Sequence, residues 1–175
     1  MTDTRVRDEL VGLSDCAWRR LVDRLEGVGD EEYLWEPAAG CWSIRPSPAG
    51  AWVADFEWPP PEPAPITTIA WRLAHITVNE DRFRPWLGLA PHPGRPPVPV
   101  ASAAGAAVTA VKTTMRDRHD DLTELTDAEL WEPIGAIGGP FADGTRVSWV
   151  LHVLDEVIHH SAEVALLRDL YRSRF

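Results

Sequence analysis

Proline is the feature that most constrains how this chain can fold. The 175 residues include 16 Pro, and most of these lie in two stretches, residues 30–65 and 90–100. Proline inside a helix removes a backbone hydrogen bond and clashes with the preceding turn, and it is equally excluded from a central strand. Both stretches are therefore predicted to be connections between regular elements.

The segments outside these connections are typical of helices. We expect helices over residues 4–28, 66–87, 101–125 and 147–171, most of which carry apolar residues at steps of three and four. No run alternates apolar and polar residues over a useful strand length. The sequence thus predicts an all-α fold, a four-helix bundle with long Pro/Trp-rich connections, and a single domain over residues 1–175.

The first connection is rich in tryptophan. It holds Trp35, Trp42, Trp52 and Trp58, four of the nine Trp in the chain. A connection this long in a compact domain is unusual and often functional. We expect these rings to pack onto the helices and to form a wall of a binding pocket.

Composition excludes several classes of function. The net charge is −10, with 17 basic and 27 acidic side chains, whereas nucleic acids and anionic membranes attract basic surfaces. The N-terminus lacks the apolar core of a signal peptide, and no apolar run is long enough to span a bilayer. Two cysteines are too few for a disulfide framework, and Cys16 is read as a packing residue. We expect a cytoplasmic protein with a small-molecule substrate.

The helix over 147–171 carries the polar residues with most chemical potential. Within LHVLDEVIHHSAEV, Glu156 and His160 are four residues apart and therefore lie on one face, at the border of the apolar arc. His152 and His159 fall further toward the polar side. On the helix over 66–87, His75 lies off the main apolar stripe, on the same side as Trp71.

His75, Glu156 and His160 could together hold one divalent metal ion in the bundle interior. Two imidazoles, one carboxylate and an open position form a known catalytic zinc set, and nickel, iron and manganese accept the same donors. A Glu and a His four apart are also commonly a solvated pair, and a single helical His is commonly a core or surface residue. The spacing alone leaves both interpretations open.

Three segments carry a resemblance to a known family. WEPAAGCWSIRP, TTIAWRLAHI and WVLHVLDEVIHHSAEVALLRDLY resemble the DinB-like superfamily of metalloenzymes. Its members are four-helix bundles that bind a divalent metal through three His, one on the second helix and a His-x-x-x-His pair on the last. The resemblance implies His75 and His160 as ligands. Glu156 stands where the family usually has His, which implies a two-His, one-carboxylate site.

The resemblance also carries expectations about the reaction. Relatives include the mycothiol-dependent maleylpyruvate isomerase and small-thiol S-transferases, in which the metal holds the thiol as thiolate. It therefore implies a metal-dependent transferase or isomerase, with mycothiol as co-substrate and a homodimer as the typical assembly. Two alternatives stay open from the residues: a hydrolase that uses metal-bound water, and a non-catalytic module that binds a small ligand or dimerises through a helix face.

Overall fold

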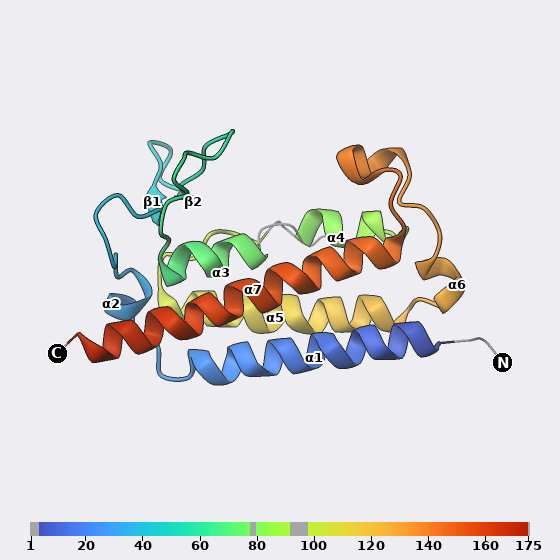
Figure 1. The fold of residues 1–175 in the computed structure, drawn as a ribbon, viewed down its shortest axis with the longest axis horizontal. Helices are drawn as coiled ribbons and strands as arrows, with labels where there is room; N and C mark the ends of the chain where they lie inside the picture. Colours follow the sequence, from blue (N-terminus) through green and yellow to red (C-terminus); the bar gives the residue numbers. More distant parts are fainter. Residues whose placement is uncertain (1–3, 78–79, 92–97, 175) are drawn as a thin grey trace.

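The computed structural model describes residues 4–77, 80–91 and 98–174, and its long elements are all helices (Figure 1). The longer helices are α1 (Arg5–Leu25), α3 (Ile69–Thr77), α4 (Glu80–Trp86), α5 (Ala104–Thr123) and α7 (Arg146–Ser173). Shorter ones are α2 (Asp30–Tyr33), α6 (Asp127–Leu130) and the 3₁₀ helix η1 (Ala136–Phe141). Strands β1 (Ile44–Pro46) and β2 (Trp52–Ala54) form an antiparallel pair. The predicted all-α class is confirmed.

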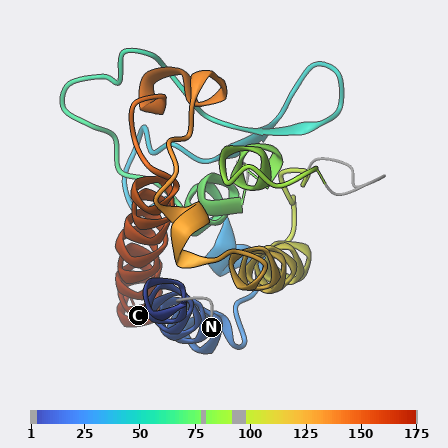
Figure 2. The ribbon, with the colours of Figure 1, turned by 90° about the vertical axis from the view of Figure 1, so that its right-hand side faces the viewer.

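The long helices pack around a common apolar centre. Helix α1 lies against α5 and α7, and α3 also lies against both α5 and α7. The view along the helix axes in Figure 2 shows α1, α5, α7 and the α3–α4 pair on four sides of this centre. Each helix buries its apolar stripe there, which is the main stabilising term for a fold of amphipathic helices. The central buried side chains include Trp18, Leu21, Leu73, Val111 and Val157.

The helix boundaries follow from local capping. Helix α1 ends at Leu25, three residues earlier than expected, because Gly27 takes a φ of 71° that a helix cannot continue. Helix α3 begins after Thr68, whose Oγ1 accepts a hydrogen bond from the Trp71 N–H at 3.2 Å. Helix α7 begins after Thr145, whose hydroxyl accepts from the Ser148 N–H. The single helix expected over residues 66–87 is described as α3 and α4, and residues 78–79 lie outside the described residues.

The connection over residues 30–65 packs onto the start of α3. The Trp42 N–H donates to the Ile66 carbonyl at 2.9 Å, and the Thr68 N–H donates to the Trp42 carbonyl at 2.9 Å. The expected docking is therefore observed, but the connection also contains α2 and the β1–β2 pair, which its proline content did not suggest. These strands have three residues each, and Pro46 is the last residue of β1. Trp58, by contrast, is 80 % exposed and is not part of the buried core.

The environment of Cys16 and the apolarity of the helices bear on two expectations from the sequence. Cys16 is exposed on α1, so its assignment as a packing residue was wrong; its neighbours Ala17 and Trp18 face the core instead. Within the described residues, none of the helices combines the length and the apolarity needed to cross a membrane.

Candidate metal centre

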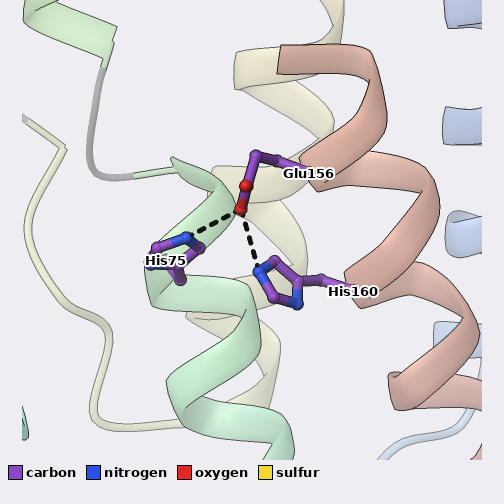
Figure 3. A group of neighbouring side chains, drawn as sticks. All are labelled: His75, Glu156 and His160. Atoms are coloured by element: carbon purple, nitrogen blue, oxygen red, sulfur yellow. Dashed lines mark hydrogen bonds and ion pairs between the residues drawn. The ribbon is translucent and has the colours of Figure 1, made fainter. Parts of the chain in front are cut away.

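The structure brings together the three residues singled out from the sequence. Glu156 Oε2 lies 3.0 Å from His75 Nε2 and 3.0 Å from His160 Nε2 (Figure 3). One ligand atom from each residue lies within 4.8 Å of the others. Two imidazole nitrogens and a carboxylate oxygen thus converge from two helices, which could hold one metal ion.

The packing of α3 on α7 explains this convergence. Glu156 and His160 are one turn apart on α7 and project side by side, and α3 presents His75 opposite them (Figure 3). The His160 side chain is only 8 % exposed, whereas those of His75 and Glu156 are each 35 % exposed. The centre therefore has one ligand anchored in the core and two at an edge that solvent reaches.

Trp71 orients the His75 ring. The two rings stack with centroids 4.8 Å apart and an interplanar angle of 10°. The Trp71 indole N–H in turn donates to the Asp55 carbonyl at 2.7 Å, and the Trp42 ring lies 5.8 Å away. The Trp-rich connection thus fixes Trp71, which limits the orientations open to His75. The cavity that His75 and Glu156 line has none of the four Trp of the connection in its wall, so the expected Trp wall was wrong there; Trp42 instead backs Trp71.

A second layer of polar residues orients His160. Glu163 Oε2 lies 2.7 Å from His160 Nδ1, and Glu163 Oε1 lies 3.0 Å from Arg72 Nη2. Arg72 Nη1 also lies 3.0 Å from His160 Nδ1. With a metal bound, a proton on Nδ1 donated to Glu163 would leave the Nε2 lone pair for the ion, the tautomer that binds a metal. Neither of these outer residues was predicted from the sequence. The three-residue spacing from Glu163 to His160 could have indicated the first, but Arg72 required the fold.

The charges of the centre favour a cation. Hydrogen bonds from His160 and then His75 hold the pKa of Glu156 well below its usual range, although partial burial opposes this effect. Burial lowers the pKa of Arg72, and its pairing with Glu163 counteracts the shift. Arginine stays protonated in proteins. Two carboxylates with one guanidinium give the centre a negative balance before the imidazoles are counted.

The remaining histidines of α7 do not contribute a donor to this set of three. His159 is 60 % exposed at its side chain and pairs with Glu163 at 3.2 Å. His152 is half-buried, and its ring lies 5.6 Å from the Trp149 ring. His159 is exposed, as its place toward the polar side predicts, but its ring lies 4.8 Å from the His160 ring, and His159, His160 and Glu163 form a second group of possible ligands. His152 instead lines a cavity of about 170 Å³ that has His75 and Glu156 in its wall.

Comparison with known proteins assigns the sequence to a family. The profile of the DinB superfamily matches residues 50–164, more than half of the chain. The chain belongs to the DinB superfamily. The matched range contains His75, Glu156 and His160, together with the outer residues Arg72 and Glu163. No curated protein and no solved structure shows significant similarity to the sequence.

Proposed function

We propose that this DinB superfamily protein is a divalent-metal-dependent enzyme and that His75, Glu156 and His160 hold the ion. The observation that carries the proposal is the convergence of Glu156 Oε2 on both imidazole Nε2 atoms at 3.0 Å. Two His and one carboxylate are the donors of catalytic zinc sites, so the residues fit such an ion. Nickel, iron and manganese remain compatible with the same donors.

Each residue has a separate part in this proposal. When bound, the ion would act as a Lewis acid and lower the pKa of a nucleophile that binds to it. Glu163 keeps His160 in the metal-binding tautomer by accepting its Nδ1 proton. Trp71 covers one face of His75 and keeps water from that side. The partial exposure of His75 and Glu156 leaves the opposite side open to reactants.

We further propose that the nucleophile is a small thiol such as mycothiol, in an S-transfer or isomerisation reaction. Two neutral imidazoles and one carboxylate leave a divalent ion with a net charge of about +1, which favours an anionic sulfur. The resemblance of the helix segments around His75 and His160 to thiol-dependent members of the superfamily supports the same choice. A homodimer in the cytoplasm is part of this proposal on the resemblance alone.

Metal analysis tests the first proposal. The untagged protein is purified without chelator, and its bound metal is measured by mass spectrometry beside His160→Ala. We expect close to one ion per chain in the wild type and loss of it in the variant. His119→Ala is a matched control, because His119 pairs with Asp15 on α1, away from the centre. Absence of metal from the wild type even after addition of zinc, nickel or manganese would favour the non-catalytic module.

Turnover measurements test the choice of nucleophile. A panel of small electrophiles is incubated with the metal-containing protein, with and without mycothiol, and product formation is followed. We expect product only when both the thiol and the metal are present, and only background rates with His160→Ala. Turnover of esters or amides without thiol would instead identify a hydrolase.

A further inference from the structure

The cavity beside the proposed metal centre contains a histidine that the centre does not use. The cavity measures about 170 Å³, and His152 lies in its wall together with His75 and Glu156. His152 and Glu156 are four residues apart on α7, so they lie on one face of the helix, about 6 Å apart along its axis. A small molecule that meets Glu156 in this cavity can therefore also contact His152, directly or through one water molecule.

The two ring nitrogens of His152 make no hydrogen bond and no ion pair with any residue that the structure describes. The residue is half-buried, and these nitrogens are not sealed from solvent, unlike the indole nitrogen of Trp149. An imidazole carries one donor and one acceptor when neutral. Both remain available to a molecule that enters the cavity.

Two aromatic side chains restrain the His152 ring. The Phe141 ring lies 5.3 Å from it and the Trp149 ring 5.6 Å, measured between centroids, and both are tilted by 33°. Trp149 is itself buried and packs against the Trp86 ring, with centroids 4.3 Å apart. Contacts between rings are made by their faces and edges and need no hydrogen bond. The packing thus positions the imidazole without occupying its nitrogens.

The other titratable groups in the described wall are already committed. His75 and Glu156 contact each other at 3.0 Å and are the proposed ligands. Arg118 also belongs to the wall, but it is buried, and it donates to the Ile76 carbonyl at 3.0 Å. Its guanidinium makes this part of the wall positive and does not exchange its proton, because arginine stays protonated in proteins. Of these groups, His152 can accept and release a proton while the centre stays intact.

We propose that His152 is the general acid–base of the transfer reaction, an inference that rests on the proposed function. The nucleophile loses its proton to a ring nitrogen of His152 and keeps the electron pair of the broken bond. It then bonds to the electrophilic atom of the substrate, whose bond to the leaving group breaks with the electron pair going to the leaving group. The imidazolium returns its proton to that leaving group. Protons and charge therefore balance over one turnover, and His152 ends as it began.

Chemical modification tests whether the nitrogens of His152 can be reached, and it needs no metal. The chelator-treated full chain is exposed to diethyl pyrocarbonate, which acylates accessible imidazole nitrogens, and the modified peptides are quantified by mass spectrometry. We expect His152 to be acylated faster than the buried His160, with the exposed His159 as the reference for full access. Acylation of His152 no faster than that of His160 would overturn the proposal, because a sealed nitrogen cannot exchange a proton with a reactant.

Turnover by the metal-containing protein tests the proton transfer itself. With the panel of electrophiles described above, His152→Gln should lower product formation about 10²–10⁴-fold, the usual contribution of a general acid–base. Its metal content should stay close to one ion per chain, which a lost ligand or a misfolded chain would not allow. His119→Ala is the matched control and should keep the wild-type rate, because His119 pairs with Asp15 away from the cavity.

Chemical rescue separates proton transfer from packing. Added imidazole should restore part of the product formation in His152→Ala, and more basic imidazoles of similar size should restore more of it. A residue that only supports the fold would show no such dependence. Wild-type rates in His152→Gln, or no rescue of His152→Ala, would overturn the role of His152 and leave the proposed function standing. Wild-type protein without metal-dependent turnover would refute the proposed function and the role of His152 with it.

Discussion

A single carboxylate oxygen of Glu156 faces both imidazoles of the centre, although the resemblance leads one to expect His at this position. If residue 156 supplies the third donor, another donor should replace it. We expect Glu156→His to keep zinc affinity within about ten-fold, whereas Glu156→Ala loses at least about 100-fold. Competition with a chromophoric chelator measures both. Wild-type affinity in Glu156→Ala would show that this carboxylate is not a ligand.

Glu163 acts one step further out, through His160. Its Oε2 lies 2.7 Å from His160 Nδ1, and its Oε1 is paired with Arg72. Replacing it with Gln keeps the shape and removes the charge that favours a proton on Nδ1. Zinc affinity should fall about 10–100-fold, the usual effect of a lost partner behind a metal-bound His. The chelator competition assay is repeated with Glu9→Gln, an exposed position on α1, which should bind as the wild type does.

At the scale of elements, a buried ion pair joins α7 to α2, and the same guanidinium holds the end of α1. The Arg168 side chain is 2 % exposed and pairs with Glu32 through Nε at 2.7 Å and Nη2 at 3.0 Å. Its other terminal nitrogen donates to the carbonyls of Arg24, in the last turn of α1, and of Glu26, the residue after the helix. One guanidinium thus satisfies the free carbonyls of one helix and ties it to another.

We therefore expect Arg168→Ala to lower the free energy of unfolding by about 3–5 kcal/mol, because it leaves the Glu32 carboxylate buried without its partner. Urea unfolding measures the change. The double variant Arg168→Met, Glu32→Leu should be less damaging than the single one, since it removes both charges. Arg116→Ala is the surface control, at a side chain that is 66 % exposed, and should cost less than about 1 kcal/mol. A loss equally small for Arg168→Ala would contradict the structural role.

At the scale of the whole molecule, the sequence predicted the helices better than their connections. Helical periodicity indicates which face of a segment is buried, and the buried residues Leu21, Leu73 and Val157 lie on such apolar faces. It also placed Glu156 and His160 on one face of α7. The β1–β2 pair was missed because strands of three residues are too short for alternation to be recognised.

Some parts of the site could not be predicted from the sequence. These parts depend on how the helices pack against one another. Arg72 meets Glu163 only because α3 packs on α7. Trp71 restrains His75 only because the connection before α3 offers the Asp55 carbonyl to its indole. The cavity beside the centre likewise exists only where α3, α4, α5 and α7 approach one another. Spacing within one helix carries no information about such distances.

Since the proposed ligands come from two helices, metal binding should stabilise the entire fold. An ion that binds only the folded chain adds about 2.7 kcal/mol at a concentration 100 times its dissociation constant. For a chain of this size, that corresponds to a rise in Tm of about 5–11 °C. Thermal unfolding of chelator-treated protein, with and without zinc, measures the shift. It should vanish in His160→Ala, which removes one of the three proposed ligands, and persist in His119→Ala. An equal shift in both variants would place the zinc elsewhere on the protein and leave α3 and α7 without a shared ion.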